Sequence, residues 1–178
     1  MNNEFSEVCR TYFSRIYNYV YARVLKRETA EDITQEIFAY ALAHWEDYDA
    51  ARGSHIAYLY RIAASRIADH FRKAYVRREV LTDDVPETAD EAAEAFPADG
   101  HDLLKHPVNR QVRDILQRLT DKERDFLSLR YGLELTNAEI AALLGISEKA
   151  VSERYRRLLA KCCRIRIENE AGKADGKN

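Results

Sequence analysis

The chain has 178 residues, of which 46% are apolar and 33% are charged, and its formal net charge is −2 at pH 7. Its six glycines and three prolines make up about 5% of the residues, where about 12% is usual. This shortage of turn formers favours an all-α protein over a sandwich or barrel. The longest apolar run, residues 140–146, is too short to span a bilayer, and the N-terminus does not resemble a secretory signal. We therefore expect a cytoplasmic protein without membrane insertion.

The residues that most often carry chemistry are scattered along the chain. The three cysteines and five histidines show no spacing suited to zinc, so we expect reduced thiols and no metal or other cofactor. A nuclease or recombinase would need converging carboxylates, and the only candidate set is Asp47, Asp49 and Asp69. These three do not share one helix face. An enzyme is therefore not expected.

Charge is divided unevenly along the chain. Residues 80–107 hold eight acidic side chains and one lysine, so this stretch carries −7 and the rest of the chain +5. It also holds all three prolines and lacks a helical stripe, which predicts an acidic, partly disordered linker. The linker separates two small helical domains, residues 1–79 and 108–167. Residues 168–178 are polar and small and are expected to form a flexible tail.

Apolar residues at three- and four-residue spacing predict two helices at the start of the N-terminal domain. The first stripe is Phe5, Val8, Cys9, Tyr12, Phe13, Ile16, Val20 and Val24. The second helix is expected to begin at a capping box, residues 29–32. Its stripe is Ile33, Ile37, Phe38, Ala41, Leu42 and Trp45. The opposite face of this helix carries Asp32, Gln35, Glu36 and Ala39.

A loop at residues 48–55 leads into a third predicted helix, which ends near Arg78. Its buried stripe is Ile56, Leu59, Tyr60, Ala63, Ile67 and Phe71. Its exposed face is Tyr58, Arg61, Ser65, Asp69 and Arg72. An aromatic ring and arginines on one exposed face suit single-stranded nucleic acid, because bases stack on rings and phosphates pair with guanidinium groups. A solvated arginine-rich helix explains this segment equally well.

The C-terminal domain is expected to contain four helices. The first has a stripe of Val108, Val112, Ile115, Leu116 and Leu119. A capping box at residues 120–123 opens the second, which holds Phe126, Leu127 and Tyr131 and ends at Gly132 as its C′ residue. Another capping box, residues 136–139, opens the third helix. The fourth is expected to be capped by Ser147, with Val151, Tyr155, Leu158 and Leu159 facing inward.

The last two helices have the spacing of a helix-turn-helix motif. Ala141 is small enough for a close crossing, Gly145 permits a positive φ at the turn, and Val151 can lock the second helix. Seven basic residues against two acidic ones lie between Ser147 and Arg166. This favours DNA binding over a helical hairpin of similar pattern.

Three segments of the chain resemble RNA polymerase sigma factors of the sigma-70 family, in the extracytoplasmic-function (ECF) subgroup. TAEDITQEIF, residues 29–38, resembles the stretch that the family presents to the polymerase. YLYRIAASRIADHF, residues 58–71, resembles the helix that reads the melted promoter strand. Residues 119–161 resemble the C-terminal promoter-binding domain. The resemblance implies an initiation factor that binds core RNA polymerase and promoter DNA, both duplex and single-stranded.

The resemblance also assigns roles to the exposed faces. For polymerase docking it implies Asp32, Gln35 and Glu36. For the melted −10 strand it implies Tyr58, Arg61, Ser65 and Arg72. The family usually has asparagine where Ser65 stands and often tryptophan where Tyr58 stands, so the base preferred by this pocket is left open.

For the −35 duplex the resemblance implies base contacts by the start of the last helix. The expected base-contacting residues are Glu148, Lys149, Ser152 and Arg156. Arg154 and Arg157 are expected to contact phosphates. Glu153 has two local alternatives, an ion pair with Arg157 or with Lys149.

Further consequences of the resemblance are a cognate anti-sigma protein and a free monomer. The acidic linker then either occupies the path of RNA through the polymerase or serves as a plain tether. One alternative remains for the whole chain, a self-sufficient helix-turn-helix regulator with an N-terminal dimerisation or ligand domain.

Overall fold

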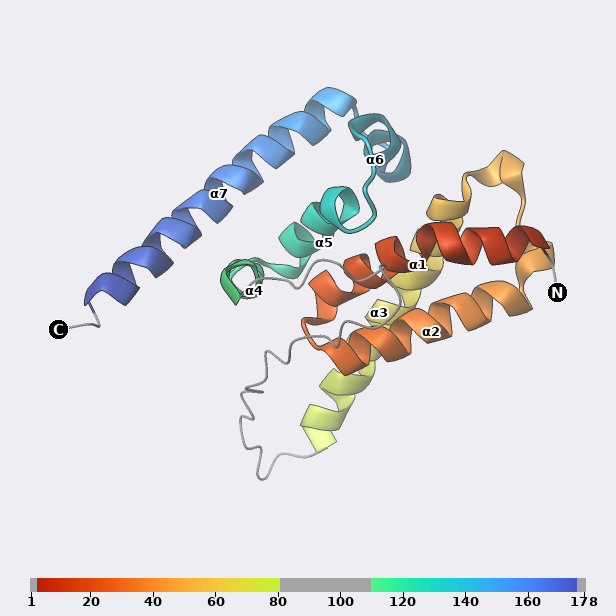
Figure 1. The fold of residues 1–178 in the computed structure, drawn as a ribbon, viewed down its shortest axis with the longest axis horizontal. Coiled ribbons are helices and arrows are strands. Elements are labelled where there is room, and N and C mark those ends of the chain that lie inside the picture. Colours follow the sequence, from red (N-terminus) through yellow and green to blue (C-terminus); the bar gives the residue numbers. More distant parts are fainter. Residues whose placement is uncertain (1–2, 81–109, 176–178) are drawn as a thin grey trace.

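The structure, a computed structural model, describes residues 3–80 and 110–175 (Figure 1). Within these ranges the chain forms seven α-helices and two 3-10 turns and no strand, which confirms the all-α prediction. None of these helices is long and apolar enough to cross a membrane. The elements are α1 (Asn3–Val24), α2 (Arg27–Ala43), η1 (Trp45–Asp47), η2 (Ala50–Arg52), α3 (His55–Val80), α4 (Arg110–Gln117), α5 (Asp121–Tyr131), α6 (Asn137–Leu144) and α7 (Glu148–Asp175).

Helices α1, α2 and α3 pack against one another as the N-terminal domain (Figure 1). Ile16, Ile37 and Leu59, one from each helix, are completely buried between them. The prediction of burial is wrong for two residues of this domain, because Leu42 is 51% exposed and Phe71 is 38% exposed. Leu42 lies in the last turn of α2, and the end of α3 that carries Phe71 projects past the other two helices.

The predicted start of α2 is also wrong. The helix begins at Arg27 and its N-cap is Lys26, which makes no side-chain capping bond. Leu25 is buried and has a positive φ of 56°, and its backbone N–H bonds to the carbonyl of Tyr21 at 2.8 Å. This tight turn brings the chain directly from α1 into α2. Thr29 therefore lies inside the helix rather than at its cap.

Both capping boxes of the C-terminal domain are confirmed, at Thr120–Glu123 and Thr136–Glu139. Gly145 has the predicted positive φ, 66°, and the Ser147 hydroxyl accepts a bond from the N–H of Ala150 at 3.2 Å. The core of the domain is built on Phe126, Leu129, Ile140, Val151 and Tyr155. Three predicted core residues are exposed: Val112, Tyr131 and Leu159.

Helix α7 continues to Asp175, whereas the sequence predicts a flexible tail from residue 168. Arg118, just after α4, explains the difference. Its guanidinium lies 2.6 Å from the carboxylate of Glu168 and donates to Asn169 at 3.1 Å. Ile165 is buried on the same part of α7. The acidic linker and Val108 lie outside the described residues.

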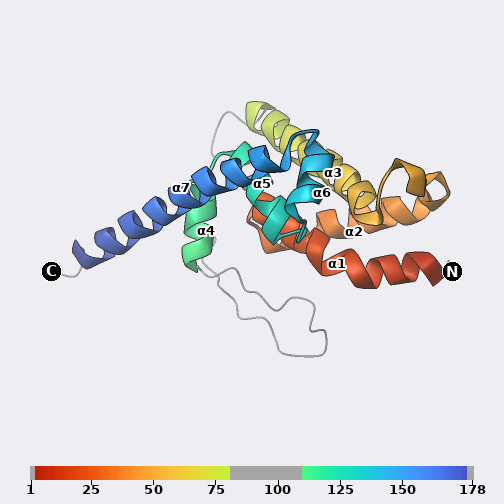
Figure 2. The ribbon, with the colours of Figure 1, turned by 90° about the horizontal axis from the view of Figure 1, so that it is seen from above.

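The two domains pack together through α1 and α5 (Figures 1 and 2). Their buried apolar residues form one continuous cluster. Gly132, at the end of α5, is not in the left-handed conformation usual for a C′ glycine, since its φ is −89° and its ψ is −58°. A Cβ atom at this position would lie 2.8 Å from the Cα of Tyr19. Glycine is therefore required here by the close approach of α1.

Candidate nucleic-acid interface

The exposed face of α2 carries the three residues predicted to dock on polymerase. Asp32, Gln35 and Glu36 are all exposed, opposite the buried Ile33 and Ile37. None of their three side chains forms a hydrogen bond or ion pair with another described residue. Because Asp32 is not part of a capping box, it has no local structural role in the helix terminus. The face is thus a free acidic and amide surface on a rigid helix.

A hollow of about 820 Å³ lies between the end of α2, the 3-10 turns and the first half of α3. This volume lies within the range of about 300–1,000 Å³ that is usual for small-molecule sites. The lining residues are Tyr40, Asp47, Arg52, Tyr58, Arg61, Ile62, Ser65 and Arg66. Three arginines against one carboxylate make the hollow electropositive, which suits a polyanion.

The aromatic side of this hollow is held in place by hydrogen bonds to the backbone. Tyr58 donates to the carbonyl of His44 at 3.2 Å, and Tyr48 donates to the carbonyl of Gly53 at 3.1 Å. The two rings lie 5.4 Å apart. Burial raises the pKa of both hydroxyls above the usual tyrosine value, so both remain protonated donors at neutral pH.

The structure brings together three of the four residues predicted for the −10 strand. Tyr58, Arg61 and Ser65 line the hollow, because residues at this spacing share a helix face. Arg72 does not line it and instead lies 2.8 Å from Asp69 on the exposed end of α3.

Five lining residues were not among those predicted for this site: Tyr40, Asp47, Arg52, Ile62 and Arg66. The guanidinium of Arg66 lies over the ring of Tyr40, 4.7 Å from its centroid, and so joins α3 to α2. Helical spacing describes one helix at a time and cannot show this pairing. The arginine-rich composition of α3 was the only signal for Arg66.

The residues predicted to contact the −35 bases lie together at the start of α7. Glu148, Lys149, Ser152 and Arg156 are all exposed and fall on one face of the helix. Asn137, the first residue of α6, donates to the hydroxyl of Ser152 at 3.0 Å. This bond ties the two helices of the motif together across the turn.

Glu153 pairs mainly with Arg156, at 2.7 Å, and secondarily with Arg157, at 3.7 Å. The pair with Arg157 was one of the two predicted alternatives, and the pair with Lys149 does not form. The bond from Arg156 holds the pKa of Glu153 below its ordinary value. Arg154 stacks over the ring of Phe126, with its guanidinium carbon 4.1 Å from the centroid. Both predicted phosphate contacts, Arg154 and Arg157, are exposed.

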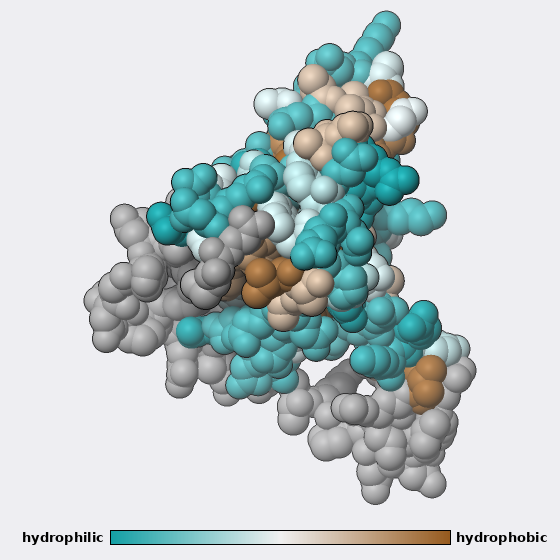
Figure 3. Space-filling model, turned by 90° about the vertical axis from the view of Figure 1, so that its right-hand side faces the viewer, coloured by the Kyte–Doolittle hydropathy of each residue, from teal (hydrophilic) through white to brown (hydrophobic). Residues whose placement is uncertain are grey.

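No group of three or more potential metal ligands occurs among the residues that the structure describes. The face shown in Figure 3 is mostly hydrophilic, with small hydrophobic areas. This polar surface is suited to contacts with polar partners.

Two family descriptions match the chain: "Sigma-70 region 2" at residues 8–77 and "Sigma-70, region 4" at residues 109–162. The ECF sigma factor SigK of Mycobacterium tuberculosis is 33% identical over 150 residues, covering 80% of this chain and 75% of the relative. The chain belongs to the ECF sigma factors of the sigma-70 family. This membership makes it a transcription initiation factor and does not favour a self-sufficient regulator.

Other ECF sigma factors align over similar lengths of this chain. SigM of Bacillus subtilis is 26% identical over 86% of this chain and 91% of its own. BldN of Streptomyces coelicolor is 29% identical over 90% of this chain, which spans only 60% of the length of that relative.

Two solved structures share the fold of this ECF sigma factor. RpoE of Bartonella quintana, in a complex with the anti-sigma factor NepR, has a TM-score of 0.68 at 16% identity, covering 91% of this chain and 96% of RpoE. CnrH, in a complex with the cytosolic domain of CnrY, has a TM-score of 0.59 at 20% identity, covering all of this chain and 92% of CnrH.

Proposed function

We propose that this sigma factor binds core RNA polymerase in the cytoplasm and directs it to promoters through two separate DNA sites. The exposed face of α2, formed by Asp32, Gln35 and Glu36, docks on the polymerase. The hollow on α3 takes the melted −10 strand, and the start of α7 enters the major groove of the −35 element. The chain supplies recognition and carries out no bond-making chemistry of its own.

One observation carries this proposal: an electropositive hollow with an aromatic wall and a helix-turn-helix motif occur in one chain, on the two matched sigma regions. In the hollow, the Tyr58 ring offers a stacking surface, while Arg61 and Ser65 offer donors to a base edge or phosphate. In the motif, Lys149 and Arg156 offer donors to base edges in the major groove.

An anti-sigma protein as a further partner is supported by the solved relatives. RpoE and CnrH were both obtained as complexes, with NepR and with CnrY respectively. We propose that this chain also has such a regulator and that it is a monomer when free.

Transcription from a randomised promoter library with purified core polymerase tests the proposal. We expect RNA only when the chain is added, from templates that share two sequence elements. A gel shift of the same templates with the chain alone should show no tight sequence-specific complex. Tight specific binding without polymerase would instead support a self-sufficient regulator.

A matched pair of variants assigns the two DNA sites. Ser65→Ala should change the selected −10 sequence and leave the −35 sequence unchanged, and Lys149→Ala should do the reverse. Both residues are exposed, so neither change should affect folding. If each variant alters both elements equally, the two sites are not separate.

A further inference from the structure

Glu153 is a carboxylate on a basic surface. Residues 149–157 of α7 carry four basic side chains and only this one acidic side chain. The four basic residues are exposed, and they lie on the part of the helix that we propose for the −35 duplex. A carboxylate on such a surface repels the phosphates of DNA and weakens non-specific binding. Its contribution must therefore come from its contacts with neighbouring side chains.

The carboxylate of Glu153 binds the guanidinium of Arg156 through two parallel hydrogen bonds. Nε of Arg156 donates to Oε2 at 3.1 Å, and Nη2 donates to Oε1 at 2.7 Å. These bonds hold the pKa of Glu153 below its ordinary value, so the carboxylate is ionised at neutral pH. Nε of Arg157 lies 3.7 Å from Oε1, which is an ion-pair distance and too long for a hydrogen bond. The hydrogen bonds of Glu153 are therefore made to Arg156.

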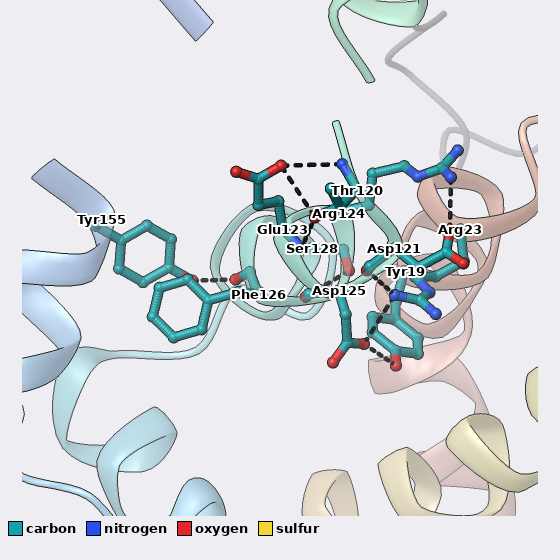
Figure 4. A network of polar contacts seen from close by, with 10 residues as sticks. All are labelled: Tyr19, Arg23, Thr120, Asp121, Glu123, Arg124, Asp125, Phe126, Ser128 and Tyr155. Carbon is teal, nitrogen blue, oxygen red and sulfur yellow. Dashed lines mark hydrogen bonds and ion pairs between the residues drawn. The ribbon is translucent and has the colours of Figure 1, made fainter. Parts of the chain in front are cut away.

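This pair contributes little to the folding of the domain. The Arg156 side chain is 74% exposed and the Glu153 side chain is 45% exposed, and exposed pairs at this spacing add little to the free energy of unfolding. Helix α7 is anchored by other residues. Val151 and Tyr155 are buried, and the Tyr155 hydroxyl donates to the backbone carbonyl of Phe126 on α5 (Figure 4). The pair therefore affects what α7 binds more than whether it folds.

Arg156 is held in place both at its backbone and at its guanidinium. One turn earlier on the same exposed face, the hydroxyl of Ser152 accepts a hydrogen bond from Asn137 of α6 at 3.0 Å. This bond and the buried anchors keep the face turned outward. Glu153 follows Ser152 at the edge of the face, and its carboxylate holds the far end of the Arg156 side chain. An unpaired arginine loses the freedom of a flexible side chain when it binds DNA, whereas Arg156 has already lost part of it.

The bonds to Glu153 leave one edge of the Arg156 guanidinium unused. A guanidinium has five N–H donors in a planar fork. Glu153 accepts from the N–H of Nε and from one N–H of Nη2, which lie on the same edge. The next edge offers one N–H of Nη1 and the second N–H of Nη2, and no other described residue accepts from Arg156. Two parallel donors are therefore available at the tip of the side chain.

Two parallel donors match the major-groove edge of guanine, where O6 and N7 both accept. Adenine is a poor match because it presents a donor, N6–H₂, in place of O6. A phosphate also accepts two bonds from an arginine. However, the carboxylate of Glu153 lies against the same guanidinium and repels an approaching phosphate. The pair therefore favours a base edge over the DNA backbone, and guanine over adenine.

We propose that Glu153 is a positioning residue of the −35 site, which holds Arg156 in the orientation that selects a guanine. The inference rests on the proposed function and deepens it, because it names the base and the side chain that fixes the choice. Glu153 acts through Arg156 and does not itself contact the DNA. Its effect is to raise specificity at one position of the −35 element and to lower the affinity for phosphates.

The test compares wild type with Arg156→Ala, Glu153→Ala and Glu153→Asp, each bound to core polymerase. The templates are promoter duplexes in which each −35 base pair is replaced in turn by the other three, and competition assays give their relative affinities. The matched control is Glu170→Ala, which removes another exposed carboxylate of α7, one that lies 3.7 Å from Arg166. Thermal unfolding followed by circular dichroism checks that each chain is folded.

In wild type and in the control, we expect one −35 position at which guanine is preferred over adenine by about 10- to 100-fold, as for a bidentate contact. Arg156→Ala should abolish this preference. Glu153→Ala should reduce it by about 3- to 10-fold, and Glu153→Asp should retain most of it because the carboxylate remains. Glu153→Ala should also steepen the salt dependence of binding, by a slope of about 0.9, because Arg156 then reaches a phosphate.

A Glu153→Ala variant with the −35 profile and the salt dependence of wild type would overturn the positioning role, and so would an equal loss of affinity for every template. A preference that depends on Arg156 but selects another base would overturn the assignment of guanine. If wild type with polymerase shows no sequence preference in either promoter element, the proposed function fails and this inference fails with it. The first two outcomes leave the proposed function standing.

Discussion

The hydroxyl of Tyr58 donates to the backbone carbonyl of His44, with 3.2 Å between the two oxygens. This bond uses the polar end of the side chain to join α3 to the end of α2. Trp45 and Tyr48 pack against the ring from the turn that follows α2. We therefore expect a DNA strand in the neighbouring hollow to contact the ring of Tyr58 rather than its hydroxyl.

We expect Tyr58→Ala to weaken binding of a single-stranded −10 oligonucleotide by about 1–3 kcal/mol, because a base loses its stacking surface. Tyr58→Phe should lose far less. Fluorescence anisotropy with the polymerase complex measures both, and Tyr75→Ala, an exposed aromatic of α3 outside the hollow, is the control. If Tyr58→Phe weakens oligonucleotide binding as much as Tyr58→Ala does, the hydroxyl contacts the strand.

On α2, we expect Glu36→Lys to lower the affinity for core polymerase by about 2 kcal/mol or more, because it reverses a charge at the centre of the docking face. The fold should be unaffected, since Glu36 is exposed and unpaired. Titration of labelled chain with core polymerase gives the affinity, and thermal unfolding checks the fold. Glu46→Lys, an exposed acid beyond α2, should bind normally. Equal losses in both variants would point to net charge alone.

Faces of single helices were predictable from the sequence. The periodicity that buries Ile56, Leu59 and Ala63 also places Tyr58 and Ser65 on the open side of α3. The two capping boxes of the C-terminal domain and Gly145 were predictable because each depends on residues within four positions, although the same pattern at residues 29–32 does not cap α2. These features need only local geometry.

Contacts between distant segments were not predictable. Tyr19 falls off the apolar stripe of α1, and it is buried where its hydroxyl donates a hydrogen bond to Asp125, 106 positions later. Gly132 has the position of a helix C′ residue, but its absent side chain makes room for α1. The contact between Tyr40 of α2 and Arg66 of α3, which forms part of the wall of the hollow, likewise joins two different helices. Helical spacing holds no information about which helices meet.

At the start of α7, we expect Lys149→Ala to reduce discrimination among −35 sequences by about 1–3 kcal/mol, because Lys149 is expected to donate to a base edge. Arg157→Ala should weaken binding to all sequences alike, as loss of a phosphate contact does. Competition assays with a panel of single-base changes distinguish the two patterns. A uniform loss for Lys149→Ala would make it a phosphate contact as well.

In the C-terminal domain, the carboxylate of Glu123 lies 2.7 Å from the ammonium of Lys161 and accepts from the N–H of Thr120 at 2.9 Å. These bonds hold the pKa of Glu123 below its ordinary value of 4.5. Since the pKa is lower in the folded state, the contribution to stability is present above pH 4.5 and is lost as the pH falls through the folded value.

Glu123→Gln isolates the ion pair, because glutamine also completes a capping box. We expect the variant to be less stable than wild type at pH 7, by no more than about 1 kcal/mol since the pair is partly exposed. The difference should shrink below pH 4.5. Urea unfolding at pH 7, 5 and 3.5 measures it, and Glu46→Gln should show no difference at any pH. A difference that stays constant with pH would assign the effect to the cap and not to the charge on Glu123.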